Sequence, residues 1–184
     1  MTDIGALAPL LLILPMAGFL LTAAIGRRLG TNAHWIPVLV MLTVWVIAMG
    51  LVVSVLSGSA PLIPGSADTH GYEMTLFTWI PAGEFQVDLG IYIDPLTACL
   101  LIVVPTVGLL VHVYSIGYMH GDAKFGRFFL YLNLFVFSML VLVLGNSLLL
   151  TFVGWEGVGL CSYFLISFWF TEEANAVAGK KAFV

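Results

Sequence analysis

The sequence contains very few charged residues. Asp, Glu, Lys and Arg together make up 9% of its 184 positions, whereas hydrophobic residues make up 61%. A water-soluble domain carries about 25% charged residues because its surface must be wetted. So little charge cannot cover a soluble particle of this size. The lipid bilayer must therefore be the solvent for most of the surface, and we expect an integral membrane protein.

Several motifs of soluble enzymes and binding proteins are also missing. The six basic residues form no extended patch, which excludes nucleic acid as a partner. There is no glycine-rich phosphate loop, no cysteine cluster for an iron–sulfur centre and no metalloprotease histidine pair. The two cysteines, Cys99 and Cys161, lie in separate apolar runs and are interpreted as small packing residues. We expect no catalytic residue, metal site or redox cofactor in this chain.

Five apolar runs are each close to the roughly 20 residues that cross a bilayer. They cover residues 4–26, 35–56, 95–118, 126–144 and 147–170. The first run follows a flank without Lys or Arg, so we expect it to be retained rather than cleaved as a signal peptide. A sixth helix is predicted to begin near Ala174. Because the sequence stops inside it, at Val184, we expect the chain to be part of a longer protein.

The positions of the basic residues predict the orientation. They lie between runs one and two, between runs three and four, and after run five, namely at Arg27, Arg28, Lys124, Arg127, Lys180 and Lys181. These three segments share one side if all five runs span the membrane, and the positive-inside rule makes that side cytoplasmic. The N-terminus and the acidic loop 57–94 are then outside. We expect a cell plasma or inner membrane, or the mitochondrial inner membrane in a eukaryote.

The loop between runs two and three contains a predicted β-hairpin. Residues 85–94 alternate between apolar and polar side chains, residues 73–80 form a second candidate strand, and residues 81–84 supply the turn. An isolated hairpin is marginally stable in water, so it should pack on its own helices or on a neighbouring subunit. Asp94 and Pro95 are predicted to begin the third helix, as an N-cap and a first-turn proline.

Glu156 is the outstanding candidate for chemistry. It lies near the middle of run five, where an ionised carboxylate costs about 2.5–3.5 kcal/mol. Burial favours its neutral form and a nearby cation favours its charged form, so a carboxylate held between these effects can bind and release a proton. The alternative is a protonated Glu hydrogen-bonded to another helix. The glycines beside it, Gly154, Gly157 and Gly159, serve either close helix packing or hydration.

Other polar residues within the apolar runs are weaker candidates. His112 is either a proton relay or a hydrogen-bonded structural residue. Lys180 is interpreted as a topology charge, while Lys181 stays a candidate for proton translocation. Four residues would line a water path or hold helices together: Asn133, Ser138, Ser162 and Tyr163.

Four sequence blocks carry a resemblance to a known family. Residues 154–163 read GWEGVGLCSY, residues 127–135 read RFFLYLNLF, residues 112–115 read HVYS and residues 181–184 read KAFV. In this order they resemble the subunit L family of bacterial respiratory complex I, whose mitochondrial counterpart is NADH dehydrogenase subunit 5. The resemblance implies the N-terminal part of an antiporter-like fold of about fourteen helices. Residues 1–56 would be its first two helices, 57–94 its outer loop, and 95–184 the start of its proton-translocating domain.

The resemblance also implies a function: a proton-translocating membrane-arm subunit that couples NADH:quinone electron transfer in other subunits to proton pumping. Glu156 matches a Glu on the fifth helix of the family, which pairs with a Lys on the seventh helix, beyond residue 184. NADH, FMN, iron–sulfur clusters and quinone would belong to partner subunits of the complex, and an adjacent antiporter-like subunit would be the nearest neighbour. The alternatives are the large subunit of a Mrp-type sodium/proton antiporter, a related hydrogenase subunit, and a structural membrane-arm element without its own proton path.

Overall fold

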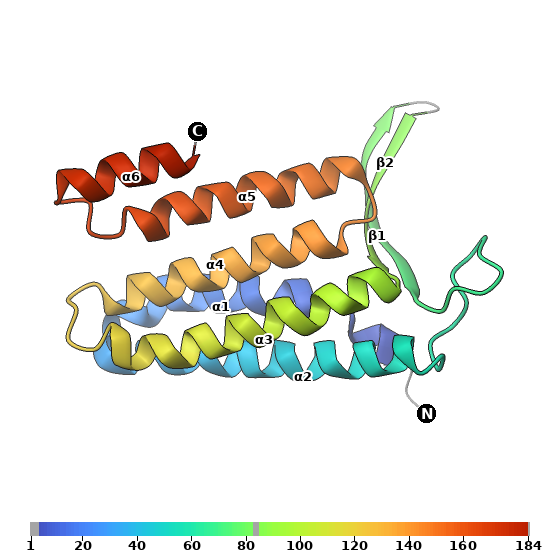
Figure 1. The fold of residues 1–184 in the computed structure, drawn as a ribbon, viewed down its shortest axis with the longest axis horizontal. Coiled ribbons are helices and arrows are strands. Elements are labelled where there is room, and N and C mark those ends of the chain that lie inside the picture. Colours follow the sequence, from blue (N-terminus) through green and yellow to red (C-terminus); the bar gives the residue numbers. More distant parts are fainter. Residues whose placement is uncertain (1–3, 83–84, 184) are drawn as a thin grey trace.

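The computed structural model describes residues 4–82 and 85–183, and within them the chain forms a helical bundle with one β-hairpin (Figure 1). The elements in chain order are η1 (Ile4–Leu7), α1 (Leu10–Leu29), η2 (Gly30–His34), α2 (Trp35–Leu56), β1 (Tyr72–Ala82), β2 (Phe85–Ile93), α3 (Pro95–Tyr118), α4 (Phe125–Leu144), α5 (Leu148–Ile166) and α6 (Glu173–Phe183). Helices α1 to α5 are long and apolar enough to cross a membrane, which confirms the prediction of five spans and the start of a sixth helix. Part of the predicted hairpin turn, residues 83–84, lies outside the described residues, as do residues 1–3 and 184.

The five long helices lie side by side along the longest axis of the molecule (Figure 1). One end carries the three segments that contain all six Lys and Arg residues, and we call it the basic end. The opposite end carries the loop after α2 and the hairpin, and we call it the hairpin end. Helix α4 is central, because it packs against α1, α3 and α5. Helix α5 lies at the edge, where it packs on α4 and α6.

The bundle has two apolar clusters. The larger one joins α1, α2, α3, α4 and the base of the hairpin through fully buried side chains that include Met41, Leu51, Ile93, Leu101 and Leu140. The smaller one lies at the basic end around Phe129 and Phe168. In a bilayer, helices gain little from leaving an apolar solvent, so close van der Waals contact and small residues hold them together.

Glycines bring α4 and α5 into close contact. A Cβ atom at Gly154 would lie 2.4 Å from the backbone nitrogen of Leu142, and one at Gly157 would lie 2.6 Å from the Ser138 hydroxyl. The connection between the two helices, residues 145–147, is short enough to force the antiparallel pair that the sequence predicts. For Gly154 and Gly157, therefore, the structure favours packing over hydration. A Cβ atom at Gly159, in contrast, would meet no neighbour within 4 Å.

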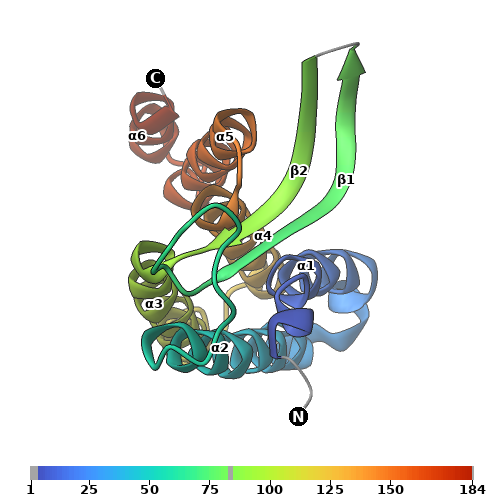
Figure 2. The ribbon, with the colours of Figure 1, turned by 90° about the vertical axis from the view of Figure 1, so that its right-hand side faces the viewer.

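The hairpin packs on its own helices at its base, and its outer part extends away from them (Figure 2). The Tyr72 and Ser54 hydroxyls are hydrogen-bonded at 2.7 Å, and Ile91 pairs with Gly145 in the α4–α5 turn. The antiparallel register shifts at Leu76 and Trp79, which a strict alternation does not predict. Asp94 caps α3 as expected, since its carboxylate accepts the Thr97 backbone N–H at 2.7 Å.

Candidate functional site

Glu156 lies near the middle of α5 and is exposed on the surface of the bundle. It makes no hydrogen bond or ion pair with any residue that the structure describes. Large apolar side chains flank it, with Phe152 57% exposed and Trp155 67% exposed. The carboxylate therefore stands alone on an apolar helix face.

Glu156 does not point into the bundle that the described residues form. Successive residues of an α-helix are rotated by about 100°. Since Gly154 and Gly157 point at α4, Glu156 between them must point away from it. Only 17% of the most apolar stretch of α5 is buried, compared with 44% in α4. The face that carries Glu156 is free for further helices.

Lys181 is exposed on α6, which folds back along the basic end of α5. A Cβ atom at Gly179 would lie 2.7 Å from the Ser167 side chain, and the Phe183 and Tyr163 rings are 6.0 Å apart. Glu156 is seven residues from Tyr163, or about 10 Å along the helix at 1.5 Å per residue. The structure therefore does not bring Lys181 and Glu156 together.

His112 and Asn133, in contrast, lie beside each other in the bundle interior, on α3 and α4. His112 is 1% exposed and Asn133 is 0% exposed. The His112 Nδ1–H donates to the Gly108 carbonyl at 2.7 Å, while Nε2 has no hydrogen-bond partner among the described residues. Neither polar atom of the Asn133 side chain has such a partner either.

The remaining predicted residues bond mainly within their own helices. The Ser138 hydroxyl donates to the Leu134 carbonyl and the Ser162 hydroxyl donates to the Val158 carbonyl, each at 2.9 Å. Ser138 also forms part of the close contact between α4 and α5. These contacts favour the interpretation of both serines as helix-packing residues. Tyr163 lies in an aromatic group at the basic end, between Phe164 and Phe183.

Sequence reasoning missed Thr22 on α1. This residue is 3% exposed, and its Oγ1 is buried without a hydrogen-bond partner among the described residues. A buried polar atom left in this state costs about 1–3 kcal/mol. The available signal was a single hydroxyl within the apolar run 4–26, which is too common in membrane helices to single out a site.

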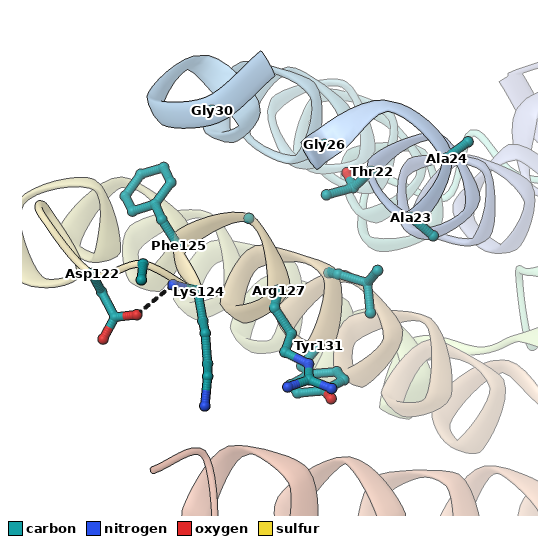
Figure 3. Close-up of a pocket in the computed structure, with 13 residues that line it drawn as sticks. Thr22, Ala23, Ala24, Gly26, Gly30, Asp122, Lys124, Phe125, Arg127 and Tyr131 are labelled. Atoms are coloured by element: carbon teal, nitrogen blue, oxygen red, sulfur yellow. Dashed lines mark hydrogen bonds between the residues drawn. The ribbon is translucent and has the colours of Figure 1, made fainter. Parts of the chain in front are cut away.

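Thr22 also lines a groove of about 800 Å³ at the basic end (Figure 3). One wall is the second half of α1, and the other is the loop before α4 with its first turns. Lys124 and Arg127 stand here over aromatic rings, with the Lys124 Nζ 4.4 Å from the centre of Phe170. Positive charge therefore borders the groove, and the groove reaches the interior of the bundle at Thr22.

Asp122 fixes the loop that borders this groove. Its carboxylate accepts the Trp169 indole N–H at 2.9 Å and the Lys124 backbone N–H at 2.6 Å. Both bonds hold the pKa of Asp122 below its ordinary value, and the bond from Trp169 has the larger effect. The contact ties the α3–α4 loop to the segment between α5 and α6. Among residues 4–82 and 85–183, no three His, Cys, Asp or Glu side chains gather as metal ligands do.

Two family descriptions match the sequence. Residues 79–129 match "NADH-Ubiquinone oxidoreductase (complex I), chain 5 N-terminus". Residues 145–184 match "NADH:quinone oxidoreductase/Mrp antiporter, TM". The first match covers the end of β1, all of β2, α3 and the start of α4, and the second covers α5 with Glu156 and α6.

Curated proteins and one solved structure are also similar to the chain. NADH-quinone oxidoreductase subunit L of Mycobacterium tuberculosis (strain CDC 1551 / Oshkosh) is 42% identical over 95% of this chain and 26% of that protein. NADH-ubiquinone oxidoreductase chain 5 of Cryphonectria parasitica is 40% identical over 95% of this chain and 25% of that protein. The chain therefore spans about a quarter of the length of these relatives. The fold matches a chain of the membrane-bound sulfane sulfur reductase, an archaeal respiratory membrane complex. The TM-score is 0.74 at 18% identity, over 96% of this chain and 33% of that chain.

Proposed function

This chain belongs to the family of NADH-quinone oxidoreductase subunit L and chain 5, and from that premise we propose that it is part of a proton-translocating membrane subunit. In this proposal, NADH oxidation and quinone reduction occur in partner subunits of a complex I, which hold the FMN and the iron–sulfur clusters. The chain itself contributes no redox centre. It belongs to the membrane arm beside another antiporter-like subunit, and it moves protons with the free energy that those reactions release.

Glu156 is the proton-carrying group in this proposal, and its isolation on α5 is the observation that supports it. An ionised carboxylate facing lipid costs about 2.5–3.5 kcal/mol, so an unpaired Glu on such a face needs either a proton or a cation. The structure leaves its apolar surroundings open to further helices, and the relatives are about four times as long as this chain. We expect a Lys on one of those helices to pair with Glu156. Movement of that cation would make the carboxylate bind or release a proton.

The proposal places proton entry on the cytoplasmic side of the membrane. The positive-inside rule places the basic end in the cytoplasm and the N-terminus and hairpin outside. Protons would then enter at the basic end and leave toward the hairpin end. His112 would act as a relay in the interior, and Lys181 would contribute a charge near the entrance.

The test is the Glu156→Gln substitution in the full-length subunit within its complex. Gln keeps the shape and hydrogen bonding of Glu but cannot ionise. We expect the complex to assemble, and proton pumping driven by NADH to fall by at least about half, with or without a parallel fall in NADH:quinone turnover. Glu173→Gln is the matched control, because Glu173 is exposed at the start of α6, and it should leave both rates unchanged. Unchanged pumping per NADH, with NADH:quinone turnover also unchanged, in an assembled Glu156→Gln complex would show that the carboxylate is structural and that the assignment of Glu156 is wrong.

A Mrp-type sodium/proton antiporter is the second candidate, because the description matched by residues 145–184 names both groups. The proteins that co-purify with the full-length protein distinguish the complex I subunit from the antiporter. A complex I subunit co-purifies with an NADH-oxidising, quinone-reducing assembly. An antiporter subunit instead catalyses sodium-dependent proton exchange without NADH.

A further inference from the structure

Three buried polar side chains from three different helices gather behind the basic end. They are Thr22 on α1, His112 on α3 and Asn133 on α4, and each is at most 3% exposed. A Cβ atom at Gly18 would lie 2.9 Å from the Asn133 Nδ2, so the amide lies against α1 one helical turn from Thr22. Asn133 lies beside the His112 ring on its other side.

All three side chains have unused hydrogen-bonding capacity. Thr22 Oγ1, His112 Nε2 and both polar atoms of Asn133 lack partners among the described residues. Thr22 differs in this from two other helix residues, Thr43 and Ser138. Their hydroxyls donate to the carbonyl four residues earlier. Buried polar atoms that protein groups do not satisfy are satisfied by ordered water, which needs two to four polar partners.

The groove at the basic end gives water a route to this cluster. Thr22, the first of the three polar side chains, is part of the groove lining (Figure 3). The groove volume of about 800 Å³ is large compared with the roughly 30 Å³ that one molecule occupies in liquid water. Gly18 leaves room for the Asn133 amide beside α1, because it carries no side chain toward α4.

We propose that Thr22, Asn133 and His112 form a hydrated inlet that carries protons from the basic-end groove into the interior of the bundle. This rests on the proposed function and adds a route of entry, with Thr22 and Asn133 as its positioning residues. The Nδ1–H of His112 is bonded to Gly108, so Nε2 presents a lone pair in the neutral ring. A proton arriving along the water chain binds at Nε2 to form imidazolium. It returns to water from the same nitrogen, which leaves the ring neutral.

Thiol labelling tests whether water reaches the cluster. The probe is the membrane-impermeant cation 2-(trimethylammonium)ethyl methanethiosulfonate, which reacts with a hydrated thiolate. It is added to the basic-end side of vesicles that contain the full complex, with Cys99→Ala and Cys161→Ser as background. We expect Asn133→Cys to react at least ten times faster than Leu140→Cys, which lies 0% exposed on the same helix in the apolar cluster. Thr22→Cys is the second variant, in case Asn133→Cys fails to assemble. Labelling as slow as at Leu140→Cys would overturn the inlet, whether the cluster is dry or a lipid headgroup fills the groove.

A hydroxyl deletion tests whether the inlet carries protons. Thr22→Val keeps the size of the side chain and removes its Oγ1. We expect it to lower both the labelling rate at Asn133→Cys and the NADH-driven pumping rate at least threefold. Thr43→Val is the control, because Thr43 is exposed on α2 away from the groove, and it should change neither rate. Normal pumping in Thr22→Val would overturn the inlet as a proton route.

The two proposals fail in different ways. If Glu156→Gln lowers pumping while Asn133→Cys stays unlabelled, the proposed function holds and the inlet is wrong. If Glu156→Gln leaves pumping per NADH unchanged while Thr22→Val lowers it, the assignment of Glu156 is wrong and the inlet stands.

Discussion

At the scale of single residues, the polar groups within the bundle differ in how well they are satisfied. The serines bond within their own helices, Tyr72 bonds to Ser54, and Asp94 caps α3. The Glu156 carboxylate, the His112 Nε2, the Asn133 amide and the Thr22 hydroxyl lack such partners among the residues that the structure describes. In an apolar solvent an unpaired polar group is costly, so these exceptions mark places where water, a proton or another helix is required.

The bond between Tyr72 and Ser54 provides a stability prediction. It joins the base of the hairpin to the end of α2, in a part of the core where both residues are buried. Tyr72→Phe removes one partner and leaves the Ser54 hydroxyl buried, which should destabilise the fold by about 1–3 kcal/mol. The measurement is the unfolding midpoint of the purified subunit in mixed detergent micelles titrated with dodecyl sulfate. Tyr114→Phe is the control, because Tyr114 is 67% exposed, and an equal midpoint for both variants would contradict the prediction.

At the scale of elements, α4 and α5 show how small residues set the position of a functional group. Gly154 and Gly157 direct one face of α5 onto α4, and the helical rotation then directs Glu156 away from it. The exposure of the carboxylate is thus a consequence of the glycine positions. The hairpin has a similar dependence, since its base is anchored to α2 and to the α4–α5 turn.

The α4–α5 contact predicts different effects for two identical substitutions on one helix. In Gly154→Ala the new methyl group would lie 2.4 Å from the Leu142 backbone nitrogen, so the helices must separate. We expect a loss of about 1–3 kcal/mol from overpacking. Gly159→Ala meets no neighbour within 4 Å and should be neutral or stabilising by up to about 1 kcal/mol. Detergent unfolding of the two variants checks this. Equal midpoints would mean that Gly154 does not set the helix spacing.

At the scale of the whole molecule, one face of the bundle is uncovered and the two ends differ in charge. One side of α5 is largely exposed and apolar, and the chain spans about a quarter of the length of its curated relatives. All six Lys and Arg residues lie in segments at one end of the bundle, while the hairpin lies at the other. This asymmetry gives the fold a defined direction across the membrane.

Orientation can be measured with single cysteines at the two ends. Ala67 lies in the loop after α2 and Ala123 in the loop before α4, and both are exposed. In a background without Cys99 and Cys161, we expect an impermeant maleimide to label Ala67→Cys in intact cells. It should label Ala123→Cys only in inside-out vesicles, because the positive-inside rule predicts that the basic end faces the cytoplasm. The reverse pattern would invert the topology and the proposed direction of proton entry.

The sequence by itself determined the number of spans, the hairpin, the cap at Asp94 and the family of the chain. These features are local: a long apolar run, a period of two and a capping side chain each fix the backbone near them. Glu156 also stood out locally, as a charge in an apolar run. The bulges at Leu76 and Trp79 could not be predicted from the sequence, because register shifts depend on the partner strand.

Which residues contact one another depends on how the helices pack. Helices such as α5 are apolar on nearly every side, so their sequence does not specify which face turns inward. Close packing at Gly154 and Gly157 fixed that rotation and left Glu156 exposed. The packing of α1 and α3 on α4 likewise brings Thr22 and His112 to Asn133. Thr22 lies about 110 residues from Asn133 in the sequence. Contacts between distant helices depend on how whole surfaces fit, and no short stretch of sequence contains that information.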